Sequence, residues 1–349
     1  MPDLEKIMGV SASDIEKVMG VSKDNIEKVM GVSIPAGVPV WAGVTGIQFG
    51  GDFSGYSNQI QYKTIQSASD TQDFGNLVVA RTHGSGAASN TTRAIMFDGQ
   101  DDNTDDGESY SVTVMDYVTV GSTGNASDFG DLLLGSNGAT GAGGGAMSNG
   151  TLAFNTDGYV SGTSAGSDMS YVTIASTGNS TNAGDMTQSG WSMGSSSGDS
   201  RGLIWHGWSL GFSNLDIIEY QAFHTSNNAS DFGDAISSEK LGATVASSAR
   251  SVHAHGSYGV EKRIDYVTVA STGDASDFGD TSSDRWFKFS GCSDGTRGEW
   301  WGGYKDYEQA GAADDDRIEY ITIASTGDSS DGADIHTAGQ LYNSATSGT

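Results

Sequence analysis

The chain has 349 residues, a formal net charge of −27 at pH 7, 51 glycines and only 3 prolines. So acidic a surface repels phosphate backbones, and one cysteine, Cys292, excludes an intrachain disulfide. No stretch approaches the roughly 18 apolar residues of a membrane span, and the start lacks the pattern of a secretory signal, so we expect neither a nucleic-acid nor a membrane partner.

The N-terminal region is built from three copies of an 11-residue unit. They read LEKIMGVSASD, IEKVMGVSKDN and IEKVMGVSIPA over residues 4–36. Apolar residues spaced i, i+3, i+4 in each unit lie on one helical face, and Ser13 with Glu16 has the spacing of a capping box. We predict a short α-helical N-terminal arm over 1–36. Its apolar positions are Leu4, Ile7, Met8, Ile15, Val18, Met19, Ile26, Val29 and Met30.

Two forms of this arm remain open. One is a continuous helix with an 11/3 repeat that supercoils with partner helices. The other is three short helices, each ended at Gly9, Gly20 or Gly31, and it is favoured because an interior glycine costs about 1 kcal/mol against alanine. Short amphipathic helices are marginal alone. The apolar stripe therefore needs a partner surface, either another protein, a further copy of the chain, or the chain's own domain.

A longer period begins after Pro39. A tyrosine two residues after an apolar residue recurs at intervals of 46 to 55 residues. These anchors are Tyr62, Tyr117, Tyr171, Tyr220, Tyr266 and Tyr320. A period near 50 residues is typical of propeller blades. We predict an all-β, six-bladed β-propeller over 37–349.

Each unit contains four strand patterns. A small-residue strand (80–90) precedes a short strand ending in glycine (92–99), and a variable loop leads to an alternating strand such as MDYVTVGST (115–123). In the alternating strand IDYVTVAST, we expect Ile264 and Asp265 on opposite faces of the sheet. A segment such as DFGDL supplies the fourth strand, which gives the blade topology of a propeller.

A decapeptide recurs six times between the third and fourth strands. It reads STGNASDFGD at 122–131 and STGDASDFGD at 271–280, with looser copies at 67–76, 176–185, 225–234 and 325–334. Its Gly and Asx residues favour a tight turn, so we interpret it as a turn repeated with each blade. We expect its phenylalanines to pack between neighbouring blades. They are Phe129, Phe232 and Phe278.

The two ends of this region are complementary. Residues 40–52 align with the second strand of the unit, and no first strand precedes them. The C-terminal segment 336–349 aligns with first strands. We therefore predict that the C-terminal strand completes the first blade and closes the ring, which removes an open sheet edge.

The unit resembles kelch-type repeats. Gly50-Gly51 and Gly302-Gly303 match the double glycine of that family, FDG at 97–99 departs from it, and DFG stands where kelch repeats carry tryptophan. The sequence style also resembles repeat proteins of tailed phages. That resemblance implies a virion component, as a fibre, appendage or capsid decoration, held to other virion proteins through the arm and expected to be a homo-oligomer.

Candidate ligand sites are few. His253 and His255 share one strand face, but no third ligand has a fixed spacing, so we interpret them as surface histidines. Asp102 and Asp106 begin a calcium-loop spacing that lacks its decisive glutamate, since Thr113 stands at that position. A solvated acidic loop is favoured, and no metal or other cofactor is predicted.

The tryptophans of the later blades have two interpretations. They are inter-blade packing residues or, where they reach a rim, platforms that stack on sugars. The glycan-binding candidates are Trp205, Trp208, Trp300 and Trp301. An adhesin for a host surface glycan is therefore the first alternative function. No nucleophile or zinc-protease motif is present, so an enzyme acting on glycans is only the second alternative and we predict no enzymatic activity.

Overall fold

The computed structural model divides the chain into two units, Met1–Val40 and Trp41–Thr349. It describes residues 6–7, 10–11, 17–18, 21–22, 28–29, 32–33, 43–51, 56–82, 84, 86–100, 113–133, 143–160, 164–191, 193–198, 201–209, 213–223, 228–238, 240–256, 262–282, 290–305, 313–314, 316–336 and 344–348.

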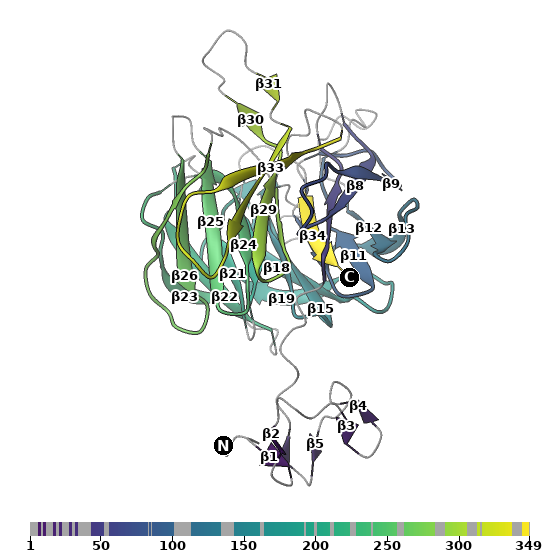
Figure 1. The fold of residues 1–349 in the computed structure, drawn as a ribbon, viewed down its shortest axis with the longest axis horizontal. Helices are drawn as coiled ribbons and strands as arrows, with labels where there is room; N and C mark the ends of the chain where they lie inside the picture. The colour runs from purple at the N-terminus through teal and green to yellow at the C-terminus, as the bar shows by residue number, and fades with distance from the viewer. Residues whose placement is uncertain are drawn as a thin grey trace. The chain divides into compact units, whose positions relative to one another are not determined.

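The second unit is a six-bladed β-propeller of four-stranded antiparallel sheets, as predicted (Figure 1). From first to fourth strand, blade 1 contains β34 (Ser344–Gly348), β7 (Thr45–Phe49), β8 (Gln59–Thr64) and β9 (Gln72–Asn76). Blade 2 contains β10 (Ala87–Ser89), β11 (Arg93–Met96), β12 (Val114–Thr119) and β13 (Ser127–Asp131). Blade 3 contains β14 (Ala146–Ser148), β15 (Leu152–Thr156), β18 (Asp168–Thr173) and β19 (Thr181–Asp185).

The remaining three blades repeat this order. Blade 4 contains β20 (Gly194–Ser197), β21 (Arg201–Trp205), β22 (Ile217–Ala222) and β23 (Ser230–Asp234). Blade 5 contains β24 (Lys240–Ala246), β25 (Arg250–Gly256), β26 (Arg263–Thr268) and β27 (Ser276–Asp280). Blade 6 contains β28 (Ser290–Ser293), β29 (Arg297–Trp301), β32 (Arg317–Thr322) and β33 (Ser330–Asp334). Two small hairpins extend from the loops between second and third strands, β16 (Tyr159–Val160) with β17 (Ser164–Ala165) and β30 (Tyr304–Lys305) with β31 (Ala313–Asp314).

The predicted closure of the ring is confirmed. β34, yellow in Figure 1, pairs antiparallel with β7 from Ser344 opposite Phe49 to Gly348 opposite Thr45. The last strand of the chain is therefore the first strand of blade 1. It supplies the first strand that is missing from the sequence before residues 40–52.

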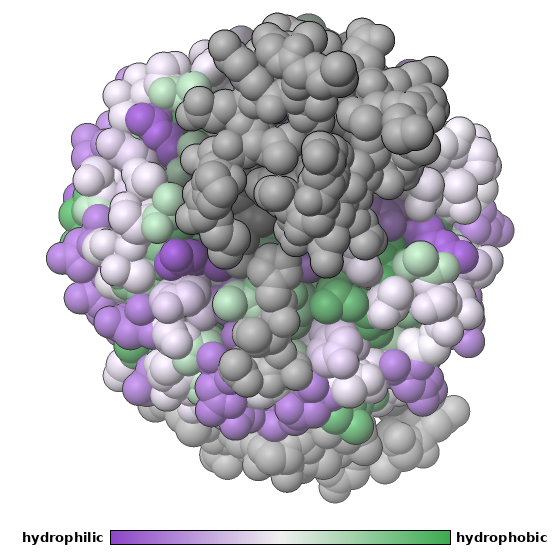
Figure 2. Space-filling view, turned by 90° about the horizontal axis from the view of Figure 1, so that it is seen from below, coloured by the Kyte–Doolittle hydropathy of each residue, from purple (hydrophilic) through white to green (hydrophobic). Residues whose placement is uncertain are grey.

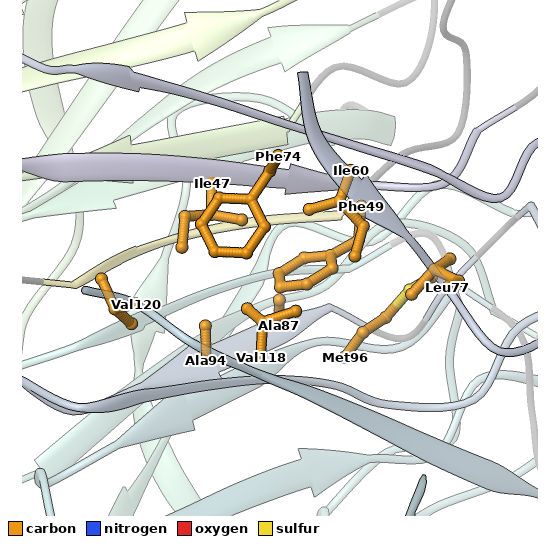
Figure 3. Packing of buried hydrophobic residues seen from close by; sticks show 10 residues of the cluster. All are labelled: Ile47, Phe49, Ile60, Phe74, Leu77, Ala87, Ala94, Met96, Val118 and Val120. Atoms are coloured by element: carbon orange, nitrogen blue, oxygen red, sulfur yellow. The ribbon is translucent and has the colours of Figure 1, made fainter. Parts of the chain in front are cut away.

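The hydrophobic core is divided among the junctions between blades. The cluster in Figure 3 combines Ile47, Phe49 and Phe74 of blade 1 with Met96 and Val118 of blade 2. Five further clusters each join residues of two successive blades, including blade 6 with blade 1. The ring is thus held by face-to-face packing of neighbouring sheets. The predicted inter-blade packing of the decapeptide phenylalanines is confirmed, since Phe129, Phe232 and Phe278 belong to these clusters.

On the coloured part of the space-filling view, hydrophobic residues lie among hydrophilic and intermediate ones (Figure 2). The large hydrophobic side chains that are exposed in the described part are Val44, Val78, Leu133 and Ile236. Single exposed apolar residues are ordinary on soluble proteins and do not by themselves define a contact surface.

The helical arm predicted over 1–36 is not confirmed. In each 11-residue unit the described residues form two strands of two residues each, which pair antiparallel. The pairs are β1 (Lys6–Ile7) with β2 (Val10–Ser11), β3 (Lys17–Val18) with β4 (Val21–Ser22), and β5 (Lys28–Val29) with β6 (Val32–Ser33). The rest of the arm lies outside the described residues.

Candidate functional site

The repeated decapeptide joins each blade to the next one. At the junction of blades 1 and 2, the Gly124 amide donates to the Phe74 carbonyl at 2.7 Å, and the Asn125 side chain accepts from the Asn76 amide at 3.1 Å. The side-chain bond recurs at all six junctions. Its acceptors are Asp70, Asn125, Asn179, Asn228, Asp274 and Asp328, and its donors are the amides of Asp334, Asn76, Asp131, Asp185, Asp234 and Asp280. We call these twelve residues the junction belt.

Close backbone approach between blades explains a glycine that five of the six decapeptide copies share, Ala333 being the exception. Gly130 has a φ of +140°, and a Cβ there would lie 2.5 Å from the Gly178 carbonyl oxygen of the next blade. Any larger residue would push the two blades apart, because the clash is with backbone. The Asx turn is also present, since the Gly130 amide donates to Asp128 at 3.0 Å. The decapeptide is therefore a turn that also fastens successive blades.

A second set of junction bonds is made by buried oxygen atoms. The second residue after each fourth strand donates its amide to the following blade, as when Val78 donates to Asp116 at 3.1 Å and Ile236 to Asp265 at 3.0 Å. The carboxylates that accept such bonds are the third-strand residues Asp116, Glu219, Asp265 and Glu319, all fully buried.

In two blades a hydroxyl oxygen, and not a carboxylate, accepts the amide of the preceding blade. The third-strand position holds Gln61 in blade 1 and Ser170 in blade 3. Thr71 accepts from the His336 amide at 2.6 Å in blade 1, and Ser180 accepts from the Leu133 amide at 2.7 Å in blade 3. One acceptor oxygen at every junction therefore bonds the backbone amide of the second residue after the preceding fourth strand.

Buried basic side chains contact three of these carboxylates. Arg81 lies 2.8 Å from Asp116, His255 lies 2.9 Å from Asp265, and His206 lies 3.4 Å from Glu219. Burial raises the pKa of Asp116 even though Arg81 opposes the shift. Burial also acts to raise the pKa of Glu219, but bonds from His206 and Thr187 outweigh it and lower that pKa.

Arginines at the start of second strands add cation–π contacts to the same junctions. The guanidinium of Arg250 lies 4.6 Å from the centre of the Tyr266 ring and donates to the Ile323 carbonyl of blade 6 at 3.2 Å. Blades 2, 4 and 6 repeat the stacking with Arg93 on Tyr117, Arg201 on Tyr220 and Arg297 on Tyr320. The anchor tyrosines that reveal the repeat are thus the platforms for these arginines.

The interpretation of His253 and His255 as surface histidines is wrong, because both are buried. Their rings do lie together, 4.8 Å apart. His253 stacks on Trp205 of blade 4 and bonds Thr244, while His255 bonds Asp265 of its own blade. Within the described ranges, no three His, Cys, Asp or Glu side chains gather as a metal site would require.

The burial of His253 is expected to make the stability of the fold depend on pH. Burial first, and the nearby His255 second, hold the pKa of His253 well below its ordinary value of 6.5. The unfolded chain binds a proton near pH 6.5 and the folded chain does not, so stability falls as pH drops below 6.5. Between pH 7.5 and 5.5 the His253 contribution is expected to lower the free energy of unfolding by about 1.3 kcal/mol.

Urea unfolding at the two pH values measures this loss. His253→Phe, which keeps a ring against Trp205, is expected to reduce the pH dependence by that amount. The exposed His336→Gln is the matched control and should leave it unchanged. Identical pH dependence in wild type and His253→Phe would show that His253 is not the source.

The candidate glycan-binding tryptophans lie inside the protein. Trp301, Trp300 and Trp205 are 0%, 1% and 2% exposed and belong to inter-blade clusters. Trp208 is 9% exposed, meets Trp191 edge-to-face at 4.3 Å and donates to Asn214 at 2.9 Å. Their ring faces pack against protein, which agrees with the packing interpretation. The weak calcium candidates Asp102 and Asp106 lie outside the described residues, as do the side chains of the predicted assembly arm.

Sequence reasoning missed the buried carboxylates, although a signal was present. An acidic residue directly precedes the anchor tyrosine in Asp116, Glu219, Asp265 and Glu319. This position was assigned to one face of a regular strand. The described part of the chain contains no helix with the length and apolar character needed to cross a membrane.

No protein-family model matches the chain, and no curated protein matches it. The fold alone defines the class, a six-bladed β-propeller, and it is consistent with the kelch-like repeat.

Proposed function

We propose that this protein is a structural component of a tailed-phage particle. The propeller is a rigid displayed body, and the arm of 11-residue repeats anchors it to other virion proteins. The observation that carries the proposal is the division of the chain into a repeat arm, Met1–Val40, and a separate closed ring, Trp41–Thr349. Several copies of the chain assemble through their arms or on a symmetric array.

The buried polar groups of the propeller support a role as a rigid body displayed on the particle. Its buried carboxylates and basic groups bond to one another or to backbone amides across blade junctions. Groups used in this way stabilise a rigid body and are withdrawn from solvent. The candidate sugar platforms Trp205, Trp300 and Trp301 are also buried, so no observation on the described residues favours the adhesin alternative.

Removing residues 1–36 tests the anchor. The truncated protein is expected to be soluble, to melt as the full chain does, and to be missing from particles, because the arm and the ring form separate units. Particles produced with the truncated gene are purified and their protein content is measured by quantitative mass spectrometry. Incorporation at normal occupancy would contradict the proposed anchor.

A finer variant tests the middle repeat. Val18→Asp with Met19→Asp introduces charge at two positions of the predicted apolar stripe. Attachment is expected to weaken about tenfold or more, since a buried unpaired charge is costly, while the melting temperature of the propeller stays unchanged. Ser22→Asp with Asn25→Asp is the matched control, because it changes the net charge by the same amount off the stripe. Equal losses in both variants would indicate a general charge effect instead of a contact by the stripe.

A further inference from the structure

One junction of the ring differs chemically from the others. At each junction, the second-strand residue opposite an anchor tyrosine faces a third-strand residue of the following blade. Four junctions place two apolar residues of one core cluster at these positions. They are Ile47 with Val118, Ile95 with Val172, Leu203 with Val267, and Val252 with Ile321. The junction of blades 3 and 4 has Phe154 and the neutral Gln221.

The junction of blades 6 and 1 instead holds a buried ion pair. Glu299 on β29 is opposite Tyr320, and Lys63 on β8 is opposite Gly46, so both occupy the equivalent positions. The Lys63 Nζ lies 2.7 Å from the Glu299 Oε1, and both side chains are fully buried. Trp301 donates to the second carboxylate oxygen at 3.0 Å, and Arg297 lies 3.0 Å from the first.

A gain in folding stability does not explain why an ion pair stands where four other junctions have apolar residues. The desolvation of two charges commonly offsets their attraction, so an apolar pair of similar volume is often equally or more stable. Apolar residues at the same positions already serve four other junctions of this protein. The pair therefore needs an explanation tied to its place.

Its place is the one junction that closes the ring. The other five junctions join blades that follow directly in the chain, whereas blade 6 must find blade 1 from the far end. Blades built from one repeated unit present similar faces, and repeat proteins commonly fail by exchanging elements between copies. A buried charge tolerates only a partner of opposite charge, because an unpaired one is strongly destabilising.

We propose that the Lys63–Glu299 pair is a recognition element that makes blade 6 close on blade 1 of the same ring and rejects apolar blade faces, including those of a second copy of the chain. An apolar blade face meeting Lys63 would bury its ammonium without the Glu299 carboxylate, and one meeting Glu299 would leave that carboxylate with Arg297 of its own strand but without Lys63. The correct partner is thereby selected by the cost of every wrong one. This inference does not depend on the proposed function.

The full-length double variant Lys63→Val with Glu299→Ile tests the proposal, because it installs the apolar residues used at other junctions. Wild type and variant are unfolded in denaturant, refolded at several protein concentrations, and analysed by size exclusion with light scattering. The variant is expected to fold with unchanged or higher stability and to give a several-fold larger oligomeric fraction that rises with concentration. Leu203→Val, a conservative change at an apolar junction, is the control and should refold as wild type does. A double variant that is monomeric at the wild-type fraction throughout would overturn the proposal.

A second experiment covers the case in which the double variant does not refold. Lys63→Glu and Glu299→Lys each place like charges at the closing junction, and each is complementary to the other across two chains. Refolded together, with one variant uniformly labelled with ¹⁵N, they are expected to form a mixed dimer that native mass spectrometry identifies by its intermediate mass. If the mixture contains only the species that each variant forms alone, the ion pair does not select the partner and the proposal fails.

Discussion

A chain that ends at residue 335 is expected to lose most of its stability and to aggregate on refolding. The deletion removes β34, which pairs with β7 over five positions and completes blade 1. At about 1 kcal/mol for each backbone pair, the ladder alone contributes roughly 5 kcal/mol, a large part of the net stability of a domain. The deletion also removes the hydroxyl bond between Ser89 and Thr346, 2.9 Å long, which is one of the contacts between blades 1 and 2. Thermal melting and the soluble fraction measure the effect.

Addition of the missing strand as a peptide separates a local effect from general damage. A peptide of residues 336–349 is expected to bind the truncated chain by strand addition and to restore its melting temperature. The control peptide carries proline at both Ala345 and Thr346. Successive amides point in opposite directions along a strand, so one of these two must face β7, and the control should not rescue. Unchanged melting of the truncated chain would show that β34 does not close the ring.

The architecture was predictable because it depends on periodic features. Tyrosines at a spacing of about 50 residues mark the third strand of every blade, and each of them supports the local packing of its blade. The absence of a first strand before residue 40 and its presence after 336 are both visible in the printed sequence. Ring closure follows from these two facts by the need to pair an open edge.

The buried polar network was harder to predict because both faces of each blade are covered by neighbouring blades. Ile264 and Asp265 are consecutive and pair without interruption with β25, so they lie on opposite faces of the sheet. Both are nevertheless fully buried, because Ile264 belongs to the cluster shared with blade 6 and Asp265 accepts from the Ile236 amide that follows blade 4. The residue pattern of a strand shows which side chains share a face, but it does not show that both faces are covered.

The closing ion pair was out of reach for a different reason. Lys63 and Glu299 are separated by 236 positions, and each looks like a surface residue on its own strand. Only the ring brings β8 beside β29. The histidines were misplaced for the same reason, since the burial of His253 comes from Trp205 of the preceding blade.

Replacing the buried carboxylate that precedes an anchor tyrosine should therefore lower the stability of the fold. In blade 5, Asp265 is fully buried and accepts from the Ile236 amide at 3.0 Å and from His255 at 2.9 Å. Asp265→Leu leaves the Ile236 amide and the buried imidazole of His255 without their acceptor. We expect the free energy of unfolding to fall by about 3–5 kcal/mol, as for other buried pairs broken on one side. Asp265→Asn, which keeps an acceptor oxygen, should cost less, and equal stability of Asp265→Leu and wild type would contradict the role of this residue.

The other blades suggest how the loss can be repaired. In blade 3, where the equivalent residue is the short Ser170, the hydroxyl of Ser180 accepts the Leu133 amide at 2.7 Å. Ala275 of blade 5 is equivalent to Ser180 of blade 3. The amide of each donates to the carbonyl of the last residue of the preceding fourth strand, Asp234 for Ala275 and Asp131 for Ser180. Ala275→Ser in the Asp265→Leu background is expected to recover about 1 kcal/mol by supplying an acceptor for Ile236. The same serine placed in the wild-type protein should have little effect, since Asp265 already accepts that amide. Recovery in the variant without a gain in the wild type would show that the amide bond between blades, and not the carboxylate as such, is what the third strand must provide.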